Sequence, residues 1–392
     1  MKIAMIGQKG IPARSGGIER HVEELSIELA ARGHEVLVFC RAWYAWPVRD
    51  YKGVRCIKTH SIATKHLDTI THTFLSILKA VQEKVDIFHF HGVGPSLLSW
   101  IPKLLRPSAK IVVTFHCIDR HHKKWGFIAR TMLQIGERIA CHIPHATIAV
   151  SKTLETYCRL SYGTTAKYIP NGTQILLEDS DPDLLKPFDL NPGNYLMMCS
   201  RLVPHKGVHT LINAWKQLKQ TNPELLKNKK LAIVGGSAFT ESYVKELHKL
   251  AENEPSIILT GNQSGNTLHS LFANSYAIIH PSESEGLPIA ILEAMSYGKC
   301  VLSSDIPENR ELTQDHGMTF RTNDEKDLKE KLAMLIENPN LVKAVGQEAR
   351  LHVAKQYDWK DIAETTEYLY ELLWLEPELT KQHIYKTKTS LQ

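Results

Sequence analysis

Residues 280–295 read HPSESEGLPIAILEAM, and this stretch combines a strand end, a glycine turn and a helix start. The apolar run Tyr276–Pro281 has the length of a buried strand, and an apolar helix is expected from about Pro288. A strand, a turn and a helix in this order aim unpaired backbone N–H groups and the positive end of the helix dipole beyond the strand. The stretch therefore predicts an α/β unit with an anion site suited to a diphosphate. The residues expected to contact this group are Gly286, Leu287, Pro288 and Ile289.

Two carboxylates flank this turn. Glu285 stands just before the helix and Glu293 lies about two turns into it. Side chains at these two positions can face one ligand from different depths, one reaching a sugar and the other a ribose. Taken alone, the pair would be a loop acid and a helix-face charge. The strand, glycine and helix around them favour the ligand-binding interpretation.

Short apolar runs alternate with amphipathic stretches through the second half of the chain. This alternation predicts a parallel sheet with helices on both faces. The expected strands are Asn194–Ser200, Leu231–Gly235, Ile257–Gly261, Tyr276–Pro281 and Cys300–Ser304, and the expected helices include Val208–Leu218, Thr267–Ala273 and Pro288–Ser296.

The same rhythm runs through the first half, so the sequence predicts two similar α/β domains. The expected strands there are Lys2–Gly7, Glu35–Phe39, Val54–Thr59, Asp86–His91, Lys110–Cys117 and Thr147–Ser151. The loop between the first strand and helix Ile18–Ala31 is rich in glycine, which lets a backbone approach a phosphate closely. Its spacing does not match GxGxxG, so NAD binding is poorly supported. A plain turn is the alternative for this loop.

An acidic and turn-rich stretch separates the two halves. We therefore expect a first domain at 1–172, a linker at 173–193 and a second domain at 194–357. An apolar helix at 358–376 must cover a hydrophobic surface, and we expect it to pack back on the first domain. The triplet Asp179-Ser180-Asp181 spells a metal-binding DxD pattern, but it falls in the expected linker, so we interpret it as a solvated acidic run and predict no metal site.

Two cations follow the first strand of the second domain. Arg201 and Lys206 stand in the segment SRLVPHKG at 200–207. As isolated residues they would be ordinary surface charges. At a strand–helix turn, beside the anion site above, each can form charge-assisted bonds to a diphosphate worth roughly 1.5–3 kcal/mol.

Together, the two glutamates in their Pro-Ser-x-x-Glu-Gly-Leu-Pro setting and the R-x4-K-G segment resemble the signature of retaining glycosyltransferases of family 4. The resemblance covers nearly the whole chain. It implies the GT-B architecture, in which two Rossmann-like domains face a central cleft. It also implies that Arg201 and Lys206 bind the donor diphosphate, that Glu293 holds the ribose and that Glu285 acts in catalysis.

The resemblance assigns further site residues. His116 follows a strand and matches a histidine beside the donor sugar, and Asp119 matches an aspartate that faces the acceptor. The family commonly has glycine after this histidine, whereas this chain has Cys117. The first loop of the family implies that Gly16 and Gly17 lie against the donor phosphates or the acceptor. From their place at strand-end turns, Gly235 and Gly261 are expected to contact the donor nucleotide. A plain turn is the alternative at all four glycines.

Charge, cysteine content and hydropathy limit the partners and the cellular compartment that the sequence is compatible with. The net charge of +5 suits an anionic substrate or an anionic membrane surface but is too diffuse to indicate nucleic acid. The seven cysteines are odd in number and form no CxxC pair, which argues against a disulfide framework and favours a reducing cytosol. No apolar run reaches the ~20 residues that span a bilayer. We expect a cytoplasmic protein, peripheral at the inner face of the membrane.

The function that the resemblance implies is transfer of a hexosyl or deoxyhexosyl group from a nucleotide-diphosphate donor to a hydroxyl acceptor, without a cofactor. The opening residues 7–17 look like those of bacterial enzymes of surface-polysaccharide assembly, which favours a lipid-linked or oligosaccharide acceptor. Two alternatives stay open: a sugar-nucleotide 2-epimerase of the same architecture, and a non-catalytic sugar-binding module. The sequence leaves the identities of the nucleotide, the sugar and the linkage undetermined.

Overall fold

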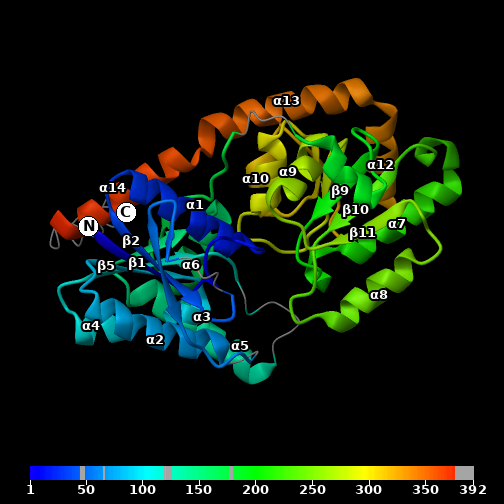
Figure 1. The fold of residues 1–392 in the computed structure, drawn as a ribbon. Helices are drawn as coiled ribbons and strands as arrows, with labels where there is room; N and C mark the ends of the chain where they lie inside the picture. Colours follow the sequence, from blue (N-terminus) through cyan, green and yellow to red (C-terminus); the bar gives the residue numbers. More distant parts are fainter. Residues whose placement is uncertain (45–48, 65–66, 119, 121–125, 176–179, 376–392) are drawn as a thin grey trace. The chain divides into compact units, whose positions relative to one another are not determined.

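The structure is a computed structural model that describes residues 1–44, 49–64, 67–118, 120, 126–175 and 180–375 (Figure 1). The chain forms two compact units. The first contains Met1–Asn171 together with the C-terminal helix from Trp359, and the second contains Gly172–Asp358. Each unit is an α/β domain built on its own sheet.

The first unit has an eight-stranded sheet in the order β3-β4-β2-β1-β5-β6-β7-β8. All neighbouring strands run parallel except the short β3, which is antiparallel to β4. Parallel strands are covered on both faces, which explains their nearly continuous apolar sequences. The strands are β1 (Lys2–Ile6), β2 (Glu35–Arg41), β3 (Asp50–Tyr51), β4 (Val54–Thr59), β5 (Ile87–His91), β6 (Lys110–Phe115), β7 (Ala146–Ala149) and β8 (Lys167–Tyr168).

Helices cover both faces of this sheet (Figure 1). On one face, α1 (Gly17–Ala31) and the C-terminal α14 (Trp359–Leu375) pack side by side, and their apolar side chains share a core with β1 and β2. The aromatic rings of Trp359 and Tyr370 are fully buried there, which explains why α14 belongs to the first unit. On the other face lie α2 (Asp68–Gln82), α3 (Val93–Ser96), α4 (Ile101–Leu105) and α5 (Phe127–His142); α6 (Lys152–Tyr162) connects β7 to β8.

The second unit has a six-stranded, entirely parallel sheet in the order β11-β10-β9-β12-β13-β14. The chain order reverses between β9 and β12, so the carboxyl ends of these two strands mark a topological switch point, where α/β sheets bind ligands. The strands are β9 (Tyr195–Cys199), β10 (Lys230–Val234), β11 (Ile257–Gly261), β12 (Ala277–His280), β13 (Val301–Ser304) and β14 (Met318–Phe320).

Helices α7, α8 and α12 cover one face of the second sheet, and their apolar residues form a core around the fully buried Trp215. Helices α9 and α10 lie on the opposite face, and α13 packs against α10 (Figure 1). The helices are α7 (Val208–Thr221), α8 (Glu241–Ala251), α9 (Gly265–Asn274), α10 (Ile289–Ser296), α11 (Pro307–Thr313), α12 (Glu325–Glu337) and α13 (Pro339–Gln356).

The fold class that the sequence predicted, α/β with two parallel-sheet domains, is confirmed. The described residues of the segment expected to be a linker at 173–193 all belong to the second unit, which begins at Gly172. Its 3-10 helix η2 (Pro182–Phe188) packs against α9, and Leu185 of this helix is fully buried. Among the described residues, the structure contains no helix with the length and hydropathy of a membrane span.

Candidate active site

Four loops of the second unit meet at the carboxyl edge of its sheet. In the loop after β9, Leu202 N donates to Gly236 O of the loop after β10 at 2.9 Å. The loop after β10 is in turn joined to the end of β11, because Gly235 N donates to Gly261 O at 2.9 Å. The loop after β12 joins them because Glu283 N donates to His205 O at 2.8 Å. These bonds fix the loops as one surface at the switch point of the sheet.

Two glycines let these loops approach closely. Gly207 has a φ of +69°, and a Cβ atom there would lie 2.1 Å from the carbonyl oxygen of Pro281. Gly235 has a φ of +146°, and a Cβ there would lie 1.8 Å from the carbonyl oxygen of Ser200. Any side chain would separate the loops, so both positions require glycine for reasons of space as well as backbone conformation.

Lys206 and Glu285 form a buried ion pair at this surface, with 2.5 Å between Nζ and Oε1. The same carboxylate oxygen lies 2.7 Å from Nε2 of His280, which is also 2.9 Å from Oγ of Ser282. Burial acts to raise the pKa of Glu285, but the Lys206 charge and the bond from His280 outweigh it and hold the pKa well below its usual range. Glu285 is therefore ionised and fixed in position at neutral pH.

Arg201 differs from Lys206 in that it is exposed, and its guanidinium makes no hydrogen bond or ion pair with the described residues. The guanidinium therefore presents its donors to solvent beside the loop that leads to Lys206. Pro288 precedes α10, and its carbonyl oxygen accepts from Ile291 N at 3.1 Å, which leaves the backbone N–H groups of Ile289 and Ala290 without intrahelical partners. A cation and a helix N-terminus on neighbouring loops form an environment suited to an anion.

Two further carboxylates belong to this edge. Burial and, next, the charge of Glu293 raise the pKa of the Cys199 thiol, which places Glu293 near the end of β9. Glu308, on α11, is partly buried; burial and then the charges of Glu285 and Glu311 raise its pKa. The edge therefore combines cationic groups with several acids at different depths.

In the first unit, the glycine-rich loop between β1 and α1 is held by two acids of α1. Glu19 Oε1 accepts from Lys9 N at 3.1 Å, and Glu23 Oε2 accepts from Ala13 N at 2.6 Å. Gly16 has a φ of +104°, and a Cβ there would lie 2.1 Å from Oε2 of Glu19. A phosphate at Gly16 and Gly17 would therefore meet the Glu19 carboxylate unless that side chain moves.

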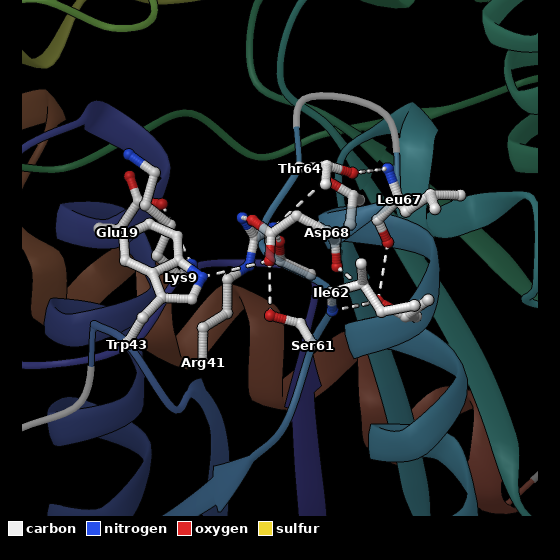
Figure 2. Close-up of polar contacts among 12 residues, drawn as sticks. Lys9, Glu19, Arg41, Trp43, Ser61, Ile62, Thr64, Leu67 and Asp68 are labelled. Atoms are coloured by element: carbon white, nitrogen blue, oxygen red, sulfur yellow. Dashed lines mark hydrogen bonds and ion pairs between the residues drawn. The ribbon is translucent and has the colours of Figure 1, made fainter.

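A buried ion pair between Arg41 and Asp68 lies next to the glycine-rich loop. Arg41 Nη1 lies 2.5 Å from Asp68 Oδ2, and the other oxygen of Asp68 accepts from Ser61 Oγ at 2.6 Å and from Trp43 Nε1 at 3.2 Å (Figure 2). The backbone N–H of Arg41 donates to Lys9 O at 2.7 Å. The network thus ties β2, α2 and the glycine-rich loop together.

His116 follows β6 and is almost fully buried among other histidines. Its Nε2 lies 3.2 Å from Nδ1 of His91, and its ring centroid is 4.7 Å from that of His21. Burial, followed by the neighbouring His21 and His89, holds the pKa of His116 well below its usual value. The imidazole is therefore neutral at pH 7.

Comparison with known proteins decides the family. Residues 15–175 match Glycosyltransferase Family 4, and residues 186–352 match Glycosyl transferases group 1. The chain is a family 4 glycosyltransferase.

Three proteins similar to this glycosyltransferase are each less than 25% identical to it but cover more than 90% of its length. The gpi3 subunit of phosphatidylinositol N-acetylglucosaminyltransferase from Schizosaccharomyces pombe is 23% identical, covering 93% of this chain and 79% of its own. A sucrose-phosphate synthase structure from Thermosynechococcus elongatus superimposes with a TM-score of 0.80 at 18% identity, covering 96% of this chain and 99% of its own. HepE from Anabaena, solved with UDP-glucose, gives a TM-score of 0.78 at 21% identity, covering 95% and 100%. These likenesses show the GT-B fold.

The structure brings one set of expected site residues of the glycosyltransferase to the carboxyl edge of the second sheet. These are Arg201, Lys206, Gly235, Gly261, Glu285, Gly286, Leu287, Pro288, Ile289 and Glu293. In the first unit, Gly16 and Gly17 lie on the loop before α1 and His116 lies after β6. Asp119 falls outside the described residues.

Sequence reasoning missed several groups of the glycosyltransferase that contact these residues. His280 stands five residues before Glu285, so its place at the end of β12 was a usable signal. Glu19 was visible as a helix-start acid after a glycine-rich loop. His21 offered no such signal, because its partner Asn171 is 150 residues away in the sequence.

Proposed function

We propose that this glycosyltransferase moves a hexosyl or deoxyhexosyl group from a nucleotide-diphosphate donor to a hydroxyl acceptor, with retention of anomeric configuration. The observation that carries the proposal is the juxtaposition of exposed Arg201, the Lys206–Glu285 pair and the start of α10 on hydrogen-bonded loops. The UDP-glucose complex of the similar HepE structure supports a nucleotide-sugar donor.

In this proposal the second unit stabilises the leaving diphosphate. Negative charge grows on the leaving oxygen as the glycosidic bond breaks, and preorganised donors lower the barrier most when they face that developing charge. Arg201 is free to bind the diphosphate directly. Lys206 shares its three N–H donors between Glu285 and the phosphate oxygens, and the first N–H groups of α10 complete the site.

The acids take separate roles. Glu293, which lies on α10 near the end of β9, holds the ribose hydroxyls. Glu285, in the loop after β12, positions the sugar. In the first unit, neutral His116 is proposed to contact the transferred sugar. Retention follows from the family resemblance, with the departing phosphate helping to take the acceptor proton, so that no protein nucleophile is required.

The acceptor is proposed to be lipid-linked or an oligosaccharide, as in bacterial exopolysaccharide, capsule or lipopolysaccharide assembly. One observation favours lipid. Helices α4 and α5 lie on the same side of the first sheet (Figure 1). Both helices expose large apolar side chains. They are Leu104, Leu105, Phe127, Ile128, Met132 and Ile135, with exposed fractions between 42% and 86%.

The charges beside these apolar residues match an anionic bilayer. The exposed ionic residues of α4 and α5 are Lys103, Arg130 and Arg138, whereas Glu137, the acid of α5, is fully buried. Glu137 bonds to Tyr157 at 2.7 Å and Tyr162 at 2.6 Å, so it is unavailable at the surface. An exposed apolar face flanked by basic residues is the pattern of a helix lying at a membrane interface.

Thermal unfolding in the presence of UDP-, GDP- and dTDP-sugars tests the donor proposal. A bound donor raises the melting temperature of the full chain by mass action. The stabilising donor is then incubated with and without lipid-linked and oligosaccharide acceptors, and the anomeric configuration of the product is read by NMR. Stabilisation by no nucleotide sugar contradicts the proposal, and epimerisation of the donor without acceptor would favour the 2-epimerase alternative.

A further inference from the structure

Three buried histidines of the first unit point ring nitrogens at one another. His21 comes from α1, His91 is the last residue of β5 and His116 follows the neighbouring strand β6. Between 1% and 7% of each residue is exposed. One nitrogen from each ring lies within 4.8 Å of the other two, so three imidazoles converge on one point.

The closest pair already has the spacing of two ligands on one metal ion. Nδ1 of His91 lies 3.2 Å from Nε2 of His116. Zinc–nitrogen bonds of 2.0–2.1 Å at a tetrahedral angle separate two ligand nitrogens by about 3.3 Å. The other nitrogen of His91, Nε2, lies 3.4 Å from Sδ of Met5 and can carry the proton of the neutral ring.

His21 is oriented by a residue outside the cluster. Its Nδ1 lies 2.8 Å from Oδ1 of Asn171, and because an amide oxygen only accepts, Nδ1 carries the proton. The lone pair therefore resides on Nε2, which is buried and has no hydrogen-bond partner among the described residues. A histidine that donates one N–H to a fixed oxygen and leaves its other nitrogen open has the usual arrangement of a metal ligand.

We propose that His21 Nε2, His91 Nδ1 and His116 Nε2 bind a divalent transition-metal ion of the zinc class. Neutral imidazoles suit Zn²⁺, and three of them leave the fourth tetrahedral position to water or hydroxide. A hydroxide would also supply negative charge, because no carboxylate of the described residues joins this cluster. One nitrogen of each ring already lies within 4.8 Å of a nitrogen of the other two, so side-chain adjustments rather than backbone rearrangement bring three ligands to the spacing of about 3.3 Å around a tetrahedral ion.

The electrostatics of the cluster are compatible with this ligand set. Burial holds the pKa of His21 at about 4 and the pKa values of His91 and His116 well below 6.5, so all three rings are in the neutral, ligating form at pH 7. The neighbouring His89 is different: its Nδ1 lies 2.6 Å from Tyr370 OH and its Nε2 lies 2.7 Å from Thr114 Oγ1. Both of its nitrogens are occupied, so His89 is not a ligand.

Metal binding here does not rest on the proposed function, since it follows from the geometry of the first unit alone. It does have a consequence for that function. His116 is proposed to contact the sugar, and coordination would occupy its Nε2. Added zinc should then inhibit transfer, and a chelator should restore it.

The direct test is calorimetric titration of ZnCl₂ into the full, tag-free chain after treatment with a chelator, supported by the visible absorption of a Co²⁺-loaded sample. We expect one ion per chain and a tetrahedral cobalt spectrum. His21→Gln should weaken binding by about 100-fold or more, since loss of an outer partner alone costs 10–100-fold. His89→Gln, the matched control, should bind as the wild type does.

A second variant covers the case in which His21→Gln does not fold, as judged by far-UV circular dichroism. Asn171→Asp keeps every ligand and replaces the amide oxygen by a carboxylate, which raises the basicity of His21 and should tighten zinc binding several-fold. The proposal is overturned if no stoichiometric binding occurs or if folded His21→Gln binds as tightly as the wild type. It would also be overturned if His89→Gln lost as much zinc affinity as His21→Gln. An Asn171→Asp variant that bound zinc no more tightly than the wild type would overturn it as well.

Discussion

Nζ of Lys206 lies 2.5 Å from Oε1 of Glu285, so a cation from the loop after β9 and an acid from the loop after β12 form a single unit. The family resemblance assigned them separate tasks, one on the diphosphate and one in catalysis. Their contact means that each sets the state of the other: the ammonium keeps Glu285 ionised, and the carboxylate holds the ammonium at the loop surface. Removing either one should therefore affect both stability and transfer.

Lys206→Ala leaves the Glu285 carboxylate buried without its cation. Breaking a buried pair by removing one partner costs about 3 kcal/mol, near the low end of the known range, and the cost is measured by urea unfolding at pH 7. Lys219→Ala is the matched control: Lys219 and Glu254 are also 2.5 Å apart, but the lysine side chain is 39% exposed against 12% for Lys206. The control should lose less than about 1 kcal/mol. Equal losses in the two variants would contradict the account.

Because His72 is buried, we expect the free energy of unfolding of the first unit to fall at acidic pH. Burial and then the charge of Arg41 lower the pKa of His72 to about 3, against 6.5 for the free side chain. Its contribution to stability is therefore complete above pH 6.5 and is lost as pH falls toward 3, at about 1.4 kcal/mol per pH unit. In His72→Met, urea unfolding between pH 7 and pH 5 should show a shallower fall in stability than in the wild type. The exposed His60→Gln serves as control, and a wild-type slope in His72→Met would refute this role.

Alanine variants of Gly207 and Gly261 distinguish the cost of a left-handed backbone from the cost of a steric clash. Gly207 and Gly261 have similar φ angles of +69° and +72°, but a Cβ would meet Pro281 O at 2.1 Å in the first case and nothing within 4 Å in the second. Gly261→Ala should therefore cost about 1–2 kcal/mol for the left-handed backbone alone. Gly207→Ala must also push the β12 loop away, so it should cost more and reduce donor binding. Melting temperatures of the two variants, compared in parallel, decide whether the loop contact matters.

The membrane proposal predicts that two side chains of α5 contribute to vesicle binding. Phe127 and Ile128 are 86% and 76% exposed, and replacing both by serine removes apolar area worth roughly 1.5–3 kcal/mol per side chain on full burial. Sedimentation with phosphatidylglycerol vesicles should therefore drop at least tenfold in the double variant. Leu160→Ser on α6, where leucine is also 76% exposed, should bind like the wild type. Equal binding to neutral phosphatidylcholine vesicles would argue against the charge component, and unchanged binding of the double variant would reject the surface.

The sequence was most informative where the fold depends on local patterns. Apolar runs such as Lys110–Phe115 and the restart of the βα rhythm near Tyr195 are local signals, and they located both sheets. The segment near Leu185 was harder to predict, because its composition is acidic and turn-rich although it contains two buried leucines and a 3-10 helix that packs on α9.

Contacts between distant residues were the part that the sequence could not supply. Local spacing identified Lys206 and Glu285 separately, but their ion pair joins loops that are 79 residues apart in the chain. The same limit applies to the three-histidine cluster, which depends on the order of β5 and β6 in the sheet and on the face of α1 that carries His21. Only the assembled topology brings such groups together.

The central claim is that the carboxyl edge of the second sheet binds a nucleoside diphosphate through Arg201. Calorimetric titration of UDP, GDP and dTDP into the wild type, Arg201→Ala and the exposed-lysine control Lys227→Ala tests it directly. The account predicts that one of these nucleotides binds the wild type and Lys227→Ala equally, and that it binds Arg201→Ala about 10–100-fold more weakly, the equivalent of one charge-assisted bond. Binding of none of the three, or equal binding to wild type and Arg201→Ala, would contradict the account.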